Sequence, residues 1–114
     1  MISVGAMVVD AVKSLAPCKA RYYTGNEKRY FVYDITDDRG DDWGDDIPDK
    51  IHYWIRLKFY YPQGENQNSM KKEVRRRLKR AGFSYAQISE VSFPEDGIDG
   101  IEWTCDFTEE SEEE

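Results

Sequence analysis

The hydrophobic pattern is most regular between residues 51 and 61, in the segment IHYWIRLKFYY. Side chains alternate there between two faces over eleven residues, about twice the usual length of a strand. A strand this long and this rich in aromatic residues is expected at the centre of a sheet. One of its faces should supply the core, with Ile51, Tyr53, Ile55, Leu57, Phe59 and Tyr61.

The segment after this strand predicts a helix over residues 70–81. It follows the turn-forming stretch PQGENQNS, and its apolar residues recur at helical spacing, at Met70, Val74, Leu78 and Ala81. Asn68 or Ser69 can cap its start, and Gly82 suits the position just past its end, because glycine takes a positive φ without penalty. The apolar stripe should pack over the core face of the long strand.

The chain before the long strand predicts one helix and two strands. Residues 3–15 carry apolar side chains at three- and four-residue spacing, with Ser3 as the cap, and Pro17 should end this helix. Residues 20–24 and 29–36 favour two strands. A Gly-Asn pair between them suggests that they form a hairpin.

Two more strands are predicted near the end of the chain, over residues 85–93 and 98–107, joined by a Pro-Glu-Asp-Gly turn. Apolar and polar residues alternate in the second, which is typical of a half-buried strand antiparallel to its predecessor. The predicted fold class is therefore α+β: a mainly antiparallel sheet of about five strands with two helices packed on one face. Residues 1–108 should form a single domain, and residues 109–114 should be a disordered acidic tail.

The composition narrows the function classes. A chain of 114 residues suits one hydrophobic core, and a net charge of −7 argues against a general nucleic-acid binder or a reader of nucleic-acid sequence. The first nine residues lack the charged start of a signal peptide, and no segment has the apolar length of a membrane span. Cys18 and Cys105 fit no ligand spacing, so we expect reduced thiols in a cytosolic protein, with a single bridge as the open alternative.

Charge is segregated into blocks along the chain. Residues 50–83 carry ten basic and two acidic residues, whereas residues 84–114 carry eleven acidic residues and no basic ones. Residues 34–49 are also acidic, with eight Asp against a single Arg. Blocks of opposite charge can neutralise each other either within one molecule or between copies of it. Between copies, a basic face that meets an acidic face makes a head-to-tail contact, and such a contact forms a ring when it closes.

The predicted second helix concentrates the basic charge, and two interpretations are open. A charged helix is usually a solvated outer face, but it also suits a surface that meets acidic residues. As a contact surface, its leading residues are Arg75, Arg76, Lys79 and Arg80. The acidic counterpart is then either the loop that contains Asp41, Asp42, Asp45 and Asp46 or the segment around Glu95 and Asp96.

That loop is predicted over residues 37–50, DDRGDDWGDDIPDK, which has no hydrophobic periodicity. A structureless stretch of about a dozen residues in a compact domain is uncommon and is usually functional or mobile. Its Asp residues lack the register of a calcium-binding loop, so we predict no metal site. Trp43 either folds back on the sheet or anchors a partner, as interface tryptophans often do.

No catalytic or cofactor-binding constellation is found. His52 is the only histidine, it lies in the middle of the long strand with no cysteine nearby, and a structural role is expected for it. The glycines fall in turns and form no phosphate-binding loop. We therefore predict a protein that is not an enzyme and has no cofactor.

The order of elements resembles the small tail-terminator, or tail-completion, proteins of long-tailed bacteriophages. That family typically opens with a helix containing a motif like VVDAVKSL, here residues 8–15, followed by a short strand and a tyrosine-rich strand like RYFVYDIT. An acidic loop like DDWGDD, a long strand like IHYWIRLKFYY and a helix ending in Ala-Gly-Phe come next. The chain closes on two strands with an acidic residue such as Glu95 between them. The resemblance spans roughly residues 3–107.

The resemblance implies a structural protein of the virion. Its copies are expected to form a ring, commonly a hexamer, on the head-proximal end of the tail tube, where the ring stops tube growth and helps to join tail to head. The implied partners are other copies of the chain, the tail tube protein and the head-tail connector protein. The implied location is the virion tail and, during assembly, the host cytoplasm.

A second class remains open from the sequence. A small acidic protein can also be an inhibitor that imitates nucleic acid and occupies the basic groove of a host nuclease or another DNA-binding protein. The basic helix argues against this alternative, because it interrupts a uniform acidic face. The mass of the protein in solution separates the two, since a ring is several times heavier than one chain.

Overall fold

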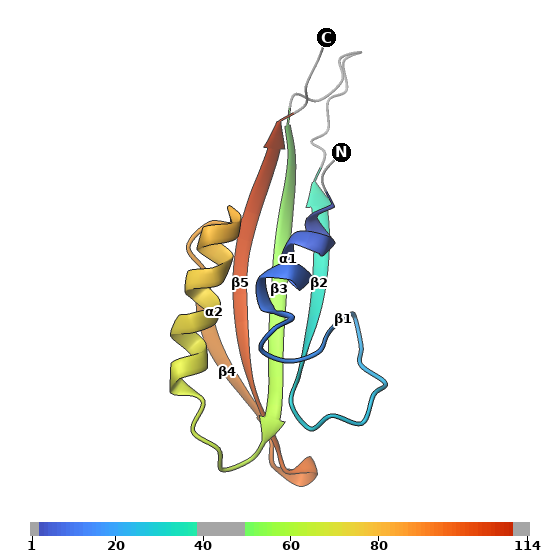
Figure 1. Ribbon diagram of the computed structural model, residues 1–114, viewed down its shortest axis with the longest axis vertical. Helices are drawn as coiled ribbons and strands as arrows, with labels where there is room; N and C mark the ends of the chain where they lie inside the picture. Colours follow the sequence, from blue (N-terminus) through green and yellow to red (C-terminus); the bar gives the residue numbers. More distant parts are fainter. Residues whose placement is uncertain (1–2, 39–49, 111–114) are drawn as a thin grey trace.

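A computed structural model describes residues 3–38 and 50–110, and these form the α+β fold that the sequence predicts. One five-stranded sheet has the strand order β1-β2-β3-β5-β4, and every neighbouring pair is antiparallel except β1 and β2 (Figure 1). The bounds are α1 Val4–Val12, β1 Cys18–Ala20, β2 Tyr30–Asp38, β3 Lys50–Pro62, α2 Asn68–Ala81, β4 Gln87–Phe93, the short 3-10 helix η1 Pro94–Asp96, and β5 Ile98–Glu110. The molecule is elongated, with extents of 53 × 26 × 24 Å.

The long strand β3 lies at the centre of the sheet, which confirms the prediction from its alternation. It pairs with β2 on one side and with β5 on the other, and the register places Tyr33, Leu57 and Trp103 side by side in one row. All thirteen residues of β3 pair with β5. Nine of these residues also pair with β2, and pairing on both sides fixes which face of β3 is buried.

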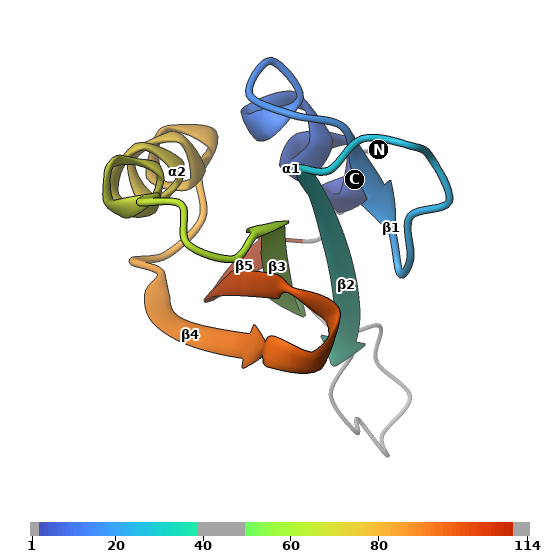
Figure 2. The same cartoon turned by 90° about the horizontal axis from the view of Figure 1, so that it is seen from below.

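The core lies on the predicted face of β3. Ile55, Leu57 and Phe59 are at most 1% exposed, and they form one hydrophobic cluster with buried residues of β2, β5 and both helices. The helices contribute Val4, Val8 and Val12 from α1 and Val74 and Leu78 from α2. Figure 2 shows both helices above the strands of the curved sheet.

The two helices begin and end through different devices. Ser3 caps α1 as predicted, since its Oγ accepts a hydrogen bond from the Ala6 amide at 3.2 Å. The predicted caps of α2 are wrong: Asn68 is already helical, and it is the Asn66 side chain that accepts from the Asn68 amide at 3.0 Å. Gly82 ends α2 with φ 111°, as predicted.

The predicted hairpin before the acidic loop is wrong. The first strand lies at Cys18–Ala20, earlier than expected, and it runs parallel to β2, with Cys18 opposite Phe31. The cause is Arg21, which has φ 70° and turns the chain out of the strand after its amide donates to the Tyr33 carbonyl at 2.8 Å. The residues that follow then return to the start of β2, which makes the pairing parallel.

The last strand is longer than predicted. β5 continues to Glu110, whose backbone pairs with Lys50, so the expected tail boundary at residue 109 lies two residues inside the sheet. The long partner β3 supplies the pairing that sequence alone did not indicate.

Candidate interaction surfaces

The basic side chains of α2 divide into those with partners inside the molecule and those without. Lys71 forms an ion pair with Glu90, and the Arg75 Nε donates to the Ala86 carbonyl at 3.0 Å while its guanidinium lies over the Tyr85 ring. Within the described residues, Lys72, Lys79 and Arg80 have no ion-pair partner, and all three are exposed.

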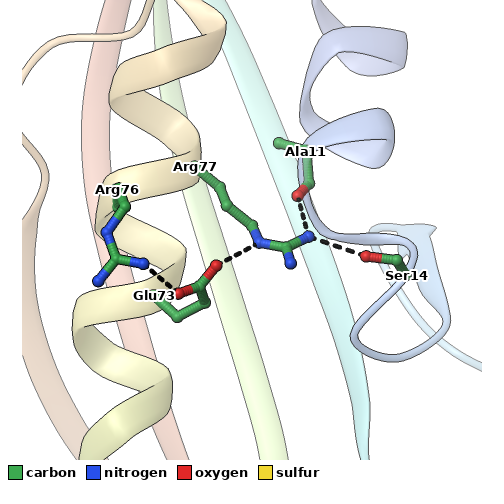
Figure 3. A network of polar contacts seen from close by, with 5 residues as sticks. All are labelled: Ala11, Ser14, Glu73, Arg76 and Arg77. Carbon is green, nitrogen blue, oxygen red and sulfur yellow. Dashed lines mark hydrogen bonds and ion pairs between the residues drawn. The ribbon is translucent and has the colours of Figure 1, made fainter.

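Arg77 connects the two helices (Figure 3). Its Nε donates to Glu73 at 2.8 Å, and its Nη1 donates to the carbonyl of Ala11 at 3.2 Å and to the hydroxyl of Ser14 at 2.8 Å. Helix α1 has no basic residue in its last turn, so Arg77 places a positive charge against the negative end of the α1 dipole. Arg76 also pairs with Glu73 but reaches no part of α1 in Figure 3.

The predicted basic surface is therefore only partly available for a partner. Of its four leading residues, Arg75 and Arg76 contact other residues of the same chain, whereas Lys79 and Arg80, in the last turn of α2, form no ion pair with any residue that the structure describes. Their role as contact residues stays a prediction. Two other basic residues of the helix have a structural use that the sequence did not reveal, because Lys71 connects α2 to β4 and Arg77 connects it to α1.

Of the predicted acidic counterparts, the pair Glu95 and Asp96 lies far from Lys79 and Arg80 in one molecule. Glu95 and Asp96 are exposed in η1, next to the end of β3, where the Gln63 amide donates to the Gly97 carbonyl at 2.9 Å. In Figure 1 η1 is at the opposite end of α2 from its last turn. The other candidates, Asp41, Asp42, Trp43, Asp45 and Asp46, lie outside the described residues.

The face of the sheet opposite the core carries paired polar residues along β3. Arg56 Nε lies 2.9 Å from the Glu102 carboxylate across the strand pair, and His52 Nε2 lies 2.8 Å from that of Asp106. The rings of His52 and Trp54 stack with centroids 4.5 Å apart, and Trp54 is 49% exposed. The structural role predicted for His52 agrees with these contacts. A hydrogen bond from Ser84, and then one from His52, lowers the pKa of Asp106.

An aromatic row crosses the same face near the η1 end of the sheet. The ring centroids of Tyr23 and Tyr30 are 4.4 Å apart, those of Tyr30 and Tyr60 5.5 Å, and those of Tyr60 and Phe93 6.2 Å. These rings line a shallow hollow of about 360 Å³, together with the side chains of Arg21 and Lys58. We call this feature the aromatic hollow. It combines a large apolar area with two cations that have no ion-pair partner among the described residues, and with one carboxylate, that of Asp96.

Gly100 makes room for this row. It lies opposite Tyr60 in the register, and a Cβ on it would lie 3.1 Å from the Tyr60 ring and 2.9 Å from Val91 Cγ2. Both distances are shorter than ordinary van der Waals contacts. Burial raises the pKa of Tyr30 and of Tyr60, so their hydroxyl groups stay neutral at physiological pH.

Arg21 is held in position at the rim of the aromatic hollow by an uncommon backbone conformation. Its φ of 70° makes it the single non-glycine residue with positive φ among the described residues. Such a conformation costs free energy for a side chain with a Cβ, and it is tolerated where the surrounding structure fixes it. Here the Arg21 amide is fixed by the Tyr33 carbonyl.

Sequence reasoning missed the aromatic hollow, although one signal was present. Tyr30 and Tyr60 occupy outward positions of β2 and β3, where exposed strand faces usually carry polar residues. The alternation showed only that they share a face opposite the core. The pattern predicted neither the chain path after the parallel strand β1, which brings Tyr23 against Tyr30, nor the contact of Phe93 from β4 with Tyr60.

The two cysteines and the possible metal ligands were the remaining candidates for a reactive site. Burial raises the pKa of Cys18 to about 11 and of Cys105 to about 12, so both thiols stay protonated, and both are free cysteines. Within residues 3–38 and 50–110, no three His, Cys, Asp or Glu side chains come together as a metal site. The described helices are also too short or too polar to span a membrane.

No model of a known protein family matches this sequence, and no curated protein matches it.

Proposed function

We propose that this chain is a structural subunit of a bacteriophage tail, and that its copies form a ring that closes the head-proximal end of the tail tube. The order of elements supports this proposal, because the tail-terminator proteins that the sequence resembles have the same order. That order is helix, short strand, tyrosine-rich strand, long strand, helix and a closing strand pair. The ring stops tube growth and contacts the tube protein and the head-tail connector protein.

The observation that carries the proposal is the separation of opposite charges along one molecule. Lys79 and Arg80 lie at one end of α2, and Glu95 and Asp96 lie near the other end, in η1. About eleven residues of helix, or roughly 17 Å, separate the start of α2 from Lys79, so one copy does not neutralise its own groups. Two copies placed head to tail do, and a head-to-tail contact that repeats and closes makes a ring.

Exposed ion pairs contribute little affinity, so charge is expected to set register and association rate while aromatic surface supplies binding free energy. The uncovered face of the sheet provides such surface. Trp54, Tyr22 and Phe93 are between 43% and 71% exposed. Large exposed aromatics on one side of a small domain are typical of a contact surface.

Light scattering with the purified protein tests the proposal. We expect a mass several times that of one chain, which falls as salt is raised, because exposed charges are screened within about 10 Å at 0.1 M salt. The variant Lys79→Glu with Arg80→Glu should keep its melting temperature and lose the large species. The control Lys19→Glu with Lys28→Glu makes the same charge change at exposed positions away from α2 and should assemble like wild type.

The acidic-inhibitor alternative predicts different results in the same samples. An inhibitor stays at the mass of one or two chains at every salt concentration and binds a nuclease or another DNA-binding protein. If reversing the charges of Lys79 and Arg80 leaves assembly unchanged, α2 is instead a solvated outer face.

A further inference from the structure

We propose that the Tyr85 side chain of one copy binds in the aromatic hollow of the next copy. This inference rests on the self-assembly proposed above, and it adds an aromatic anchor to the ionic contact between α2 and η1. The donor lies between the end of α2 and the start of β4, and the acceptor lies on the outer face of the sheet beside η1.

Tyr85 is the exposed aromatic side chain that lies away from the hollow and its face. Among the described residues, four large hydrophobic side chains are between 43% and 71% exposed: Tyr22, Trp54, Tyr85 and Phe93. Tyr22 and Phe93 line the hollow themselves, and Trp54 lies on the same face of β3 as Tyr60. Tyr85 instead contacts α2. It is therefore the one of the four that a head-to-tail contact can bring to the hollow of another copy.

The Tyr85 ring is held in place although most of it is exposed. The Arg75 guanidinium lies over the ring, 4.2 Å from its centroid, and the Arg75 Nε donates to the Ala86 carbonyl at 3.0 Å. Arg75 thus fixes both the ring and the backbone beside it, while the side chain of Tyr85 stays 63% exposed. An aromatic side chain that is ordered before it binds loses little conformational entropy in the contact.

A tyrosine suits the mixed charge of the hollow. Arg21, Lys58 and Asp96 all line it, so an acidic or a basic side chain would meet a like charge there. The neutral phenol ring packs against the aromatic rings of the hollow, and a cation binds favourably to its face. Its hydroxyl both donates and accepts hydrogen bonds, so it can donate to the carboxylate of Asp96 or accept from Lys58.

Free charges lie next to both surfaces. Lys72 and Lys79 are three residues before and four residues after Arg75, so they share the side of α2 that contacts Tyr85. Both lysines are exposed and have no ion-pair partner within the part of the chain that the structure describes. The acceptor side has the two exposed carboxylates of η1. With the ring in the hollow, the lysines of one copy come near the carboxylates of the next, and opposite charges set the register.

The donor and the acceptor of one molecule do not meet. Phe93, in the hollow, ends β4 and lies six residues after Gln87, which corresponds to roughly 20 Å. Tyr85 precedes Gln87 and is held against α2 by Arg75, on the side of the sheet that the helices cover. Each copy therefore keeps one free donor and one free acceptor, and each added copy extends the assembly until the ring closes.

The test uses two full-length variants, each lacking one side of the contact. Tyr85→Ser removes the donor ring and keeps the hollow. Asp96→Arg leaves the hollow with cations only and keeps the donor. The controls are Tyr85→Phe, which retains the ring, and Asp10→Arg, which makes the same charge change at an exposed residue of α1. Circular dichroism melting checks that each variant is folded.

We expect each test variant alone to self-associate more weakly than wild type, by about thirtyfold for Tyr85→Ser, since interface tyrosines are frequent hot spots. Both controls should assemble like wild type. Mixing the two test variants should restore one working contact, because the intact hollow of Tyr85→Ser accepts the tyrosine of Asp96→Arg. The mixture should therefore give a one-to-one heterodimer and nothing larger, measured by sedimentation velocity with one variant labelled.

A crosslinking experiment locates the contact directly. Tyr85 is replaced by the photoreactive residue p-benzoylphenylalanine, and copies of this variant are mixed with isotopically labelled wild type and irradiated. Mass spectrometry then identifies the peptides joined to position 85. The inference predicts crosslinks to labelled peptides that contain residues 21–23, 58–60 or 93–98. Crosslinks confined to other segments, or to the same copy, overturn it.

The outcomes separate this inference from the proposed function. If Tyr85→Ser forms the wild-type oligomer, the inference is wrong and the ring proposal stands. If crosslinks reach the hollow but the particles are open chains of copies, the inference holds and the ring proposal fails. A wild-type protein that remains a monomer at every concentration overturns both.

Discussion

The contact between α2 and the end of α1 can be tested by comparing two neighbouring arginines. Both pair with the same carboxylate, but they differ in their other contacts. Arg76 and Arg77 both pair with Glu73, but Arg77 alone also reaches α1, at the Ala11 carbonyl and the Ser14 hydroxyl. Arg77→Ala should therefore destabilise the fold and Arg76→Ala should not.

The magnitude follows from the bonds that each substitution removes. Hydrogen bonds to a charged group contribute about 1.5–3 kcal/mol each when well shielded. The Arg77 side chain is 27% exposed, so its two bonds to α1 are discounted. With the loss of a charge at the α1 C-terminus included, we expect the free energy of unfolding to fall by about 1.5–3 kcal/mol. The Arg76 side chain is 57% exposed, and its removal should produce no measurable change.

Urea denaturation followed by tryptophan fluorescence measures both variants, since Trp103 is fully buried. Equal slopes of free energy against urea concentration would show that the two variants unfold over a similar surface. Amide hydrogen exchange in α1 should rise in Arg77→Ala and stay unchanged in Arg76→Ala. Equal destabilisation by the two substitutions would show that Arg77 contributes only helix surface charge, and the reasoning would then be wrong.

Three further predictions concern the core, the aromatic row and acid. Leu57→Ala should lower the free energy of unfolding by about 2–5 kcal/mol, because Leu57 is fully buried in the central strand; a melting temperature within two degrees of wild type would contradict this. Gly100→Ala should cost about 1–3 kcal/mol by displacing Tyr60 or Val91, measured by urea denaturation beside the control Ser89→Ala, which is exposed on the same strand pair. The pKa of Asp106 is lowered on folding, so its contribution to stability is complete above the unfolded pKa of about 4 and is lost as pH falls through the folded pKa. Asp106→Asn should therefore lose less stability than wild type as pH falls below about 4, and identical pH profiles would exclude this role.

Much of the fold could be predicted from the sequence because the strongest signals are local. Period-2 alternation over residues 51–61 identified the central strand and its buried face, and Gly82 marked the end of α2. The parallel pairing of β1 could not be predicted, because it depends on the positive φ of Arg21, a residue type that gives no such signal. Likewise, the sequence did not show that α2 begins at Asn68, or that the Asn66 side chain accepts from the Asn68 amide, because Asn68 and Ser69 are equally suitable residues at the start of a helix.

The candidate surfaces were harder to predict from the sequence than the fold, because they depend on contacts between distant segments. Charge along α2 is easy to count, but whether Arg77 faces solvent or the end of α1 depends on how two distant helices pack. The aromatic hollow is assembled from four separate segments of the chain. A pattern within one strand shows which side chains share a face and gives no information on which others join them.

Negative-stain electron microscopy of the purified protein, alone and mixed with bacteriophage tail tubes, tests the central claim most directly. The account predicts ring-shaped particles of uniform diameter, either free in solution or seated on one end of each tube. Particles of single-chain size that leave both tube ends bare, at concentrations well above those found during assembly, would contradict it.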